Sequence, residues 1–179
     1  MIDTLITSRT RIKLLTRFFL NADARAHLRG LETEFGESSN AIRIELNRFE
    51  KAGLLVSGWD GIKKMYQANT SHPLYKDIHS ILLKHLGLDH IIQKVIEGLG
   101  DLRRVYMTGD YARGLDNGTV DLLLIGNDVD SDYLAGLIGK AEKLISRTVR
   151  YHVCPEVEEQ QYLKDEQEEN FLLLWESED

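Results

Sequence analysis

The feature that most constrains the fold is a run of helix and hairpin signals that fills residues 1–70. Apolar residues recur at helical spacing up to Phe19, and Ser8 is placed to cap this first helix. The break at 21–23 precedes a second, shorter helix, which Gly36 is expected to end. Two helices joined by a short connection therefore begin the chain.

A third helix is predicted after Gly36. Ser38 and Ser39 are placed to cap it, the helix runs to about Ala52, and Gly53 closes it in a left-handed conformation. One face is apolar and a second face is polar. The apolar face consists of Ile42, Leu46 and Phe49, and the polar stripe consists of Asn40, Arg43, Asn47 and Lys51.

Two strands are predicted next, at 54–57 and 64–68, with a hairpin turn at 58–61. Helix, helix-turn-helix and then β-hairpin is the order of a winged helix-turn-helix, whose third helix reads the DNA major groove. Small polar residues begin that helix, and lysines lie beside the hairpin. The candidate DNA-binding residues are Ser38, Ser39, Asn40, Arg43, Asn47, Lys51, Lys63 and Lys64.

The segment 39–55 carries a resemblance to a known family. The pattern Leu-x-x-Phe-x-x-x-Gly-Leu-Leu, from Leu46 to Leu55, resembles the recognition helix and first wing strand of ArsR-like bacterial regulators. The resemblance implies a DNA-binding transcriptional regulator. The same elements also serve as protein-docking modules, so that alternative stays open.

Charge is distributed unevenly along the chain. The net charge is −7, but residues 1–72 hold 11 Lys and Arg against 8 Asp and Glu, a balance of +3. The remaining residues hold 11 against 21, a balance of −10. This asymmetry predicts units with different roles.

The expected fold class is α+β, with three segments. Residues 1–70 form the winged helix-turn-helix, 71–100 a helical connector, and 101–179 a small α/β domain with an acidic tail. Pro73 suits the first turn of the first connector helix. Both connector helices are amphipathic, which favours packing between the units or a dimer contact.

Alternating strands and a helix are predicted in the third segment. Strands are expected at 103–108, 120–126 and 148–153, and a helix at 132–145. The first of these strands ends in Gly109, and the second begins beside Asp121. This arrangement predicts a compact α/β domain.

The third segment resembles the minimal nucleotidyltransferase domain. That family shows Gly-Ser, then Ala-Arg-Gly, then a strand with Asp-x-Asp-Leu. Here Gly109, the run 112–114 and the pair Asp121–Leu122 match these elements. The resemblance implies a phosphate-cradling turn and carboxylates that hold two metal ions.

Three departures from the family pattern change the expectation. Asp110 replaces the motif serine, Thr119 replaces the first aspartate, and 148–153 offers no third carboxylate. Two Mg²⁺ ions need several negatively charged oxygen ligands. We therefore expect no enzyme activity, no catalytic residue, no metal and no cofactor. The residues of a vestigial nucleotide site would be Gly109, Asp110, Arg113, Gly114 and Asp121.

The end of the chain is acidic from 156 to 179 and is interrupted by an apolar patch at 171–175. We expect this patch to form a helix that docks on the third segment. Cys154 is the single cysteine, which excludes an internal disulfide. A cytoplasmic location is expected, because no signal peptide or membrane span is evident.

The predicted function is DNA-binding transcriptional regulation. The recognition helix would enter the major groove, the wing would contact the backbone, and the third segment would have a sensing or assembly role. The expected partners are double-stranded DNA, a second copy in a homodimer, and a small-molecule or nucleotide effector, with no membrane. The alternatives are an active nucleotidyltransferase and an antitoxin-like protein-interaction module.

Overall fold

The computed structural model describes residues 2–98, 101–115, 117–145, 147–165 and 171–177. The protein is a mixed α+β protein, as expected. Its contacts divide the chain into two compact units, Met1–His85 and Leu86–Asp179. The predicted connector is shared between them: helix α5 (Tyr75–Leu86) falls almost wholly in the first unit and helix α6 (Leu88–Gly98) in the second.

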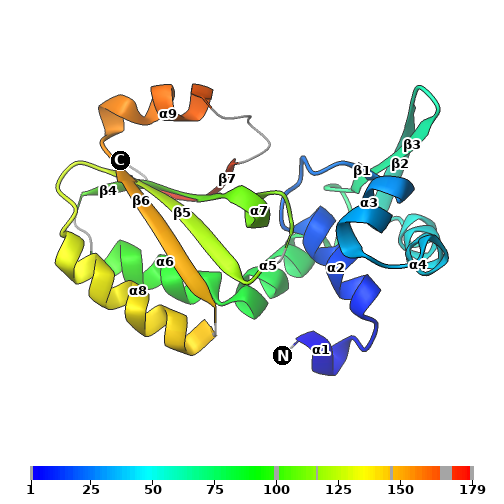
Figure 1. Ribbon diagram of the computed structural model, residues 1–179, viewed down its shortest axis with the longest axis horizontal. Coiled ribbons are helices and arrows are strands. Elements are labelled where there is room, and N and C mark those ends of the chain that lie inside the picture. Colours follow the sequence, from blue (N-terminus) through cyan, green and yellow to red (C-terminus); the bar gives the residue numbers. More distant parts are fainter. Residues whose placement is uncertain (1, 99–100, 116, 146, 166–170, 178–179) are drawn as a thin grey trace. The chain divides into compact units, whose positions relative to one another are not determined.

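In its described residues, the first unit combines helices α1 to α5 with a small antiparallel sheet (Figure 1). The sheet has the strand order β1-β3-β2, so its middle strand is the one that comes last of the three along the sequence. Before α5 the elements are α1 (Ile2–Leu5), α2 (Arg9–Phe19), β1 (Ala26–His27), α3 (Leu28–Phe35), α4 (Ser39–Lys51), β2 (Leu55–Asp60) and β3 (Lys63–Ala68).

The predicted helix ends in this unit are confirmed. The Ser8 Oγ accepts a hydrogen bond from the Arg11 amide at 3.2 Å, and the Ser38 Oγ accepts one from the Ala41 amide at 3.3 Å. Gly36 and Gly53 have φ values of 64° and 75°, a region that glycine enters without a steric penalty.

The predicted turn of the hairpin needs correction. It was expected at 58–61, but β2 continues to Asp60 and pairs with Lys63, which leaves Gly61 and Ile62 as the turn. Gly61 has a φ of 56°, and a two-residue hairpin loop requires this left-handed geometry. Trp59 therefore lies in the strand rather than in the turn.

One apolar core joins the helices to the sheet in the first unit. Helix α5 packs on this core, because Leu82 is fully buried in it and the Tyr75 ring lies 5.7 Å from that of Phe19. The buried core residues are Ile2, Leu14, Leu15, Phe18, Phe19, Ala26, Leu31, Ile42, Leu46, Phe49, Leu55, Tyr66, Ala68 and Leu82.

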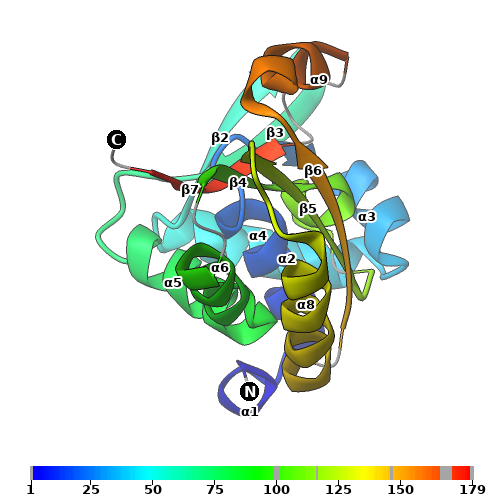
Figure 2. The ribbon, with the colours of Figure 1, turned by 90° about the vertical axis from the view of Figure 1, so that its left-hand side faces the viewer.

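A four-stranded sheet of order β6-β5-β4-β7 forms the centre of the second unit. The pair β5 and β6 is parallel and is linked through α8, whereas the other pairs are antiparallel. Figures 1 and 2 show α6 and α8 on one face of the sheet and α9 on the other. The elements after α6 are β4 (Leu102–Thr108), α7 (Gly109–Ala112), β5 (Thr119–Gly126), α8 (Ser131–Ile145), β6 (Thr148–Cys154), a 3-10 turn (Glu156–Glu158), α9 (Glu159–Asp165) and β7 (Phe171–Glu176).

The expectation of a helix at 171–175 is wrong. This segment is strand β7, which pairs antiparallel with β4 at the edge of the sheet. Some predicted features lie outside the described residues: Leu99 of the second connector helix and the tail acids Glu166, Glu168, Glu169, Glu178 and Asp179. Within the described ranges, no helix has both the length and the apolar character that crossing a membrane requires.

Candidate nucleic-acid interface

Helix α4 presents its polar stripe to solvent because its other face is buried. The buried face of α4 consists of Ile42, Leu46 and Phe49, which lie in the core. The next residue around the helix from each of the first two therefore points outward. Arg43, Asn47 and Lys51 are exposed, as predicted, and Asn40 is exposed one turn earlier. Ile44 adds an apolar side chain, 43% exposed, to this stripe.

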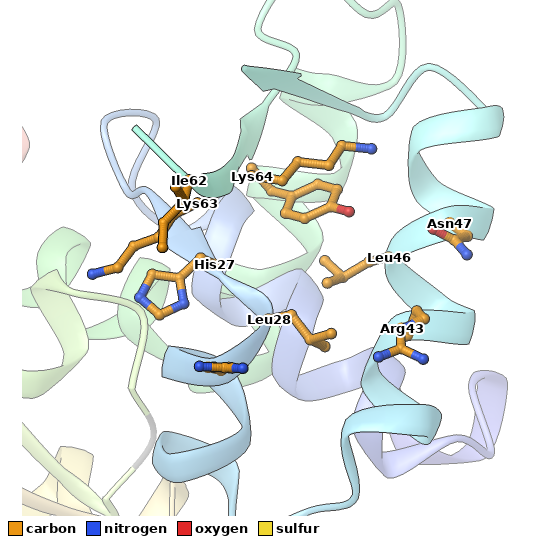
Figure 3. A pocket seen from close by; sticks show the side chains of 10 residues that line it. His27, Leu28, Arg43, Leu46, Asn47, Ile62, Lys63 and Lys64 are labelled. Carbon is orange, nitrogen blue, oxygen red and sulfur yellow. The ribbon is translucent and has the colours of Figure 1, made fainter. Parts of the chain in front are cut away.

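A groove of about 540 Å³ lies between α4, the start of α3 and the β2–β3 hairpin. Figure 3 shows Arg43 and Asn47 on the helix, with Lys63 on the hairpin across the groove. None of the described lining residues is acidic, so we call this hollow the basic groove. Its lining residues are His27, Leu28, Arg29, Arg43, Leu46, Asn47, Ile62, Lys63, Lys64 and Tyr66.

The cations of the basic groove differ in their availability. The Lys64 Nζ lies 2.8 Å from Glu50 Oε2 and 5.0 Å from the centre of the Tyr66 ring. In the described part of the first unit, no ion pair engages Arg29, Arg43 or Lys63. Three exposed cations in the groove thus retain their full charge for a ligand.

Glu50 fastens the hairpin to α4. Its carboxylate accepts hydrogen bonds from Lys64 at 2.8 Å and from Ser57 Oγ at 2.5 Å, one from each strand. These two hydrogen bonds, partly opposed by burial, hold the pKa of Glu50 below its usual value. The hydrogen bond to Glu50 likewise raises the pKa of Lys64. The hairpin is therefore tied to the helix by a charge-assisted network.

A second network orients α4 against α2. Glu45 is buried, and Arg11 of α2 donates to both of its oxygens, at 2.9 and 3.2 Å. Arg48 donates to the same carboxylate at 2.9 Å. Other α2 cations also have internal partners: Lys13 lies 2.8 Å from Glu37, and Arg17 lies 3.1 Å from Glu34. Arg11, Lys13 and Arg17 of α2 are thus engaged by carboxylates of the first unit.

The structure brings together half of the residues that the sequence assigned to DNA. Arg43, Asn47, Lys63 and Lys64 line the basic groove. The other four, Ser38, Ser39, Asn40 and Lys51, are not among its lining residues. The Ser38 hydroxyl is engaged as the cap of α4.

Sequence reasoning missed the contribution of α3. His27 caps this helix, with its Nδ1 accepting from the Gly30 amide at 3.1 Å, and Arg29 is exposed in the first turn. Both line the groove. The sequence does show Arg29 beside the start of a helix. The distance between Arg29 and α4, however, depends on the pairing of β1 with β3.

The second unit gathers four of the five residues of its predicted site at one end of the sheet. Gly109 follows β4 with a φ of 67°, and a Cβ there would lie 2.9 Å from Asp121 Oδ2. Asp110 pairs with Arg113 and accepts a hydrogen bond from Asn117 at 2.7 Å. The positive φ at this position favours glycine, and a larger residue there would also press on the Asp121 carboxylate.

Arg150 is a further member of this cluster that the sequence did not reveal. It pairs with Asp121 across the parallel strands β5 and β6 and donates to both carboxylate oxygens, at 2.6 and 3.0 Å. The hydrogen bonds to Asp121 and the charge of that residue raise the pKa of Arg150. Asp110 and Asp121 are both engaged by guanidinium groups, so one of these ion pairs must open before either carboxylate can bind another group.

The fifth residue of that predicted site, Gly114, has a φ of 79° in the loop after α7. It is buried. Its amide donates to the carbonyl of Tyr111 at 2.9 Å, which closes the turn. Gly114 therefore shapes the loop that carries Arg113.

Two solved structures are similar to part of the chain. A candidate nucleotidyltransferase from Sulfolobus solfataricus is 23% identical, with a TM-score of 0.40, over 57% of this chain and 88% of that one. A mutant of the toxin–antitoxin pair MntA–HpeT is 19% identical, with a TM-score of 0.40, over 51% of this chain and 73% of that one. No family model and no curated protein matches the sequence.

These similarities correct one expectation. The sequence predicted that the chain is not an enzyme, but one similar structure is a candidate nucleotidyltransferase, and a loss of catalysis is not shown. At TM-scores of 0.40 the similarities establish neither fold nor activity for this chain.

Proposed function

We propose that the first unit binds double-stranded DNA, with α4 in the major groove and the β2–β3 hairpin against the backbone. The observation that carries this proposal is the basic groove, which joins the polar stripe of α4 to the cations of α3 and the hairpin. Support for the proposal comes from the order of elements, helices α2 to α4 and then the β2–β3 hairpin, which is the order expected for a winged helix-turn-helix.

The exposed stripe of α4 has the chemistry that base reading needs. Arg43 can pair with guanine and Asn47 with adenine, since each presents two groups to a base edge. Ile44 can contact a thymine methyl group. The helix has 13 residues, so it is about 20 Å long and can follow the groove over several base pairs.

The phosphate contacts in this proposal come from the flanks of the stripe. Arg29 and Lys63 are exposed, and no ion pair within the described first unit engages them. Such side chains position a protein on the duplex without reading sequence. A homodimer would double their number and match two half-sites.

Selection from a random DNA pool tests this proposal with the full-length protein. We expect wild-type protein to enrich a sequence and the Arg43→Ala/Asn47→Ala variant to lose that enrichment. Lys76→Ala is the control, because Lys76 is exposed on α5 and is not among the groove residues. Failure of the wild type to enrich any sequence, with a protein partner copurifying at equal stoichiometry, would favour the protein-interaction alternative.

A second candidate function is nucleotide transfer by the second unit. The observation that favours it is the left-handed turn at Gly109, packed directly against the Asp121 carboxylate. Arg150, whose side chain is 68% exposed, can swing away from Asp121 when another group binds there. Incubation with labelled nucleotides and Mg²⁺ tests this function: labelling that Asp121→Asn abolishes would support it, and absence of labelling would contradict it.

A further inference from the structure

The tip of the β2–β3 hairpin carries two large apolar side chains in water. Trp59 is 74% exposed and Ile62 is 95% exposed. Ile62 lies in the turn, where residues are usually small or polar because they meet solvent on nearly all sides, and Trp59 lies in β2 two residues before the turn. An indole and a branched aliphatic chain at one tip therefore form an apolar wedge without a partner in the described residues.

The wedge borders the basic groove through Ile62, whereas Trp59 lines a separate hollow beside β2 and β3. Ile62 and Lys63 line the groove, and Trp59 pairs in register with Lys64, another lining residue. Asp60 is the only acid of the tip, and it pairs in register with Lys63. The charge around the wedge is thus complementary to phosphate rather than to a basic protein surface.

The hairpin holds the wedge at a fixed position relative to α4. Glu50 of α4 bonds Ser57 on one strand and Lys64 on the other, at 2.5 and 2.8 Å. The other edge of β3 is paired with β1. These contacts therefore fix the position of the hairpin relative to α4, the helix that carries Arg43 and Asn47.

We propose that Trp59 and Ile62 insert into the minor groove of the duplex whose major groove is read by α4. Apolar wedges that enter between base pairs unstack the step and bend the duplex. The adjacent Lys63 would contact the flanking phosphate. This inference rests on the proposed function and adds to it a deformation of the DNA, which favours flexible pyrimidine–purine steps at a position away from α4.

Binding and bending measurements on the full-length protein test the wedge. The probe is a mixed-sequence duplex that carries 2-aminopurine and a fluorophore pair at its ends. We expect binding to raise 2-aminopurine emission and to bring the duplex ends closer. Trp59→Ala/Ile62→Ala should abolish both changes and weaken binding about tenfold or more, as loss of contact between an aromatic side chain and a base does.

Val56→Ala is the matched control, since Val56 is an exposed apolar residue of the same hairpin that does not line the groove. It should leave affinity and bending unchanged. Tryptophan emission should also change on DNA addition in the wild type and not in Trp59→Phe.

Three outcomes would overturn the wedge, and they are distinguishable. If the wild type binds the duplex and the double variant binds and bends it equally well, the wedge is excluded and the proposed function stands. If the wild type does not bind duplex DNA, both fail. If the double variant converts a dimer into a monomer without altering the bend, the tip is a contact between copies of the chain.

Discussion

At the residue scale, the two acidic side chains that are buried within the described ranges are both held by arginines. Glu45 receives hydrogen bonds from Arg11 and Arg48, and Glu159 receives them from Arg104 and from the Tyr106 hydroxyl. A buried carboxylate without such donors would destabilise the fold. These two groups therefore give predictions that concern stability rather than binding.

Glu45→Ala should lower the free energy of unfolding by about 1–3 kcal/mol, since it removes hydrogen bonds to a charged group and leaves Arg11 without its partner. Arg48→Ala should cost less than about 1 kcal/mol, because exposed ion pairs contribute little and the Arg48 side chain is 61% exposed. Urea denaturation measures both. An equal loss in the two variants would contradict the role of Glu45 between α2 and α4.

Tyr106 should make the fold sensitive to high pH. Burial, followed by its hydrogen bond to Glu159, raises the pKa of Tyr106 from 10.0 to about 12. The folded chain then keeps a proton that the unfolded chain loses, so this contribution is complete below pH 10 and is lost as the pH rises through 12. Phenolate absorbance of the wild type minus that of Tyr106→Phe should titrate near this raised value. A difference curve centred at pH 10 would refute the shift.

At the element scale, the proposed DNA contact of the hairpin depends on its attachment to α4. Glu50 neutralises Lys64 in the basic groove while it holds the two strands. Glu50→Gln keeps the size of the side chain but frees the lysine charge. We expect duplex affinity to rise a few-fold, and the slope of log affinity against log salt to steepen by about one, for one added phosphate contact.

The control for this prediction is Glu32→Gln, which removes one negative charge from α3 at a residue that does not line the groove. It should change affinity less than Glu50→Gln does. Lower affinity in Glu50→Gln would mean that the hairpin position matters more than the charge of Lys64.

Elements set by local signals could be predicted, and those set by distant partners could not. The caps Ser8 and Ser38 and the turn at Gly53 act within a few residues, and all three are confirmed. The run 171–175 is apolar at every position, so it carries no period that separates a helix from a strand. This segment is strand β7 because it pairs with β4, which lies about 65 residues earlier in the sequence.

The same contrast applies to the candidate sites. The stripe of Arg43 and Asn47 follows from helical spacing alone, and both residues line the groove. Arg29 joins them through the sheet, and Glu50 neutralises Lys64 across 14 positions. In the second unit, Arg150 reaches Asp121 across 29 positions. Such partners depend on strand register, which a single sequence does not specify.

At the scale of the whole molecule, the division into units falls between His85 and Leu86, so Gly87 is the second residue of the second unit. Gly87 has a φ of 74°, and a Cβ there would lie 2.1 Å from Ile145 Cγ2. Gly87→Ala should therefore destabilise the protein by more than about 1 kcal/mol. Gly136→Ala is the matched control in α8, where the added methyl meets open space, and it should stabilise by about 0.5–1 kcal/mol.

Urea unfolding of the two glycine variants measures this difference. The expected order of stability is Gly136→Ala, then wild type, then Gly87→Ala. Equal stability of Gly87→Ala and wild type would mean that the turn between α5 and α6 does not require its left-handed conformation.

The salt dependence of duplex affinity distinguishes DNA binding through the basic groove from binding elsewhere or from no binding. We expect wild-type affinity to fall steeply with salt, and Arg29→Ala/Lys63→Ala to make the slope shallower by about two, one for each lost phosphate contact. Lys76→Ala should keep the wild-type slope. A flat salt response in the wild type, or equal slopes in all three proteins, would contradict DNA binding at this groove.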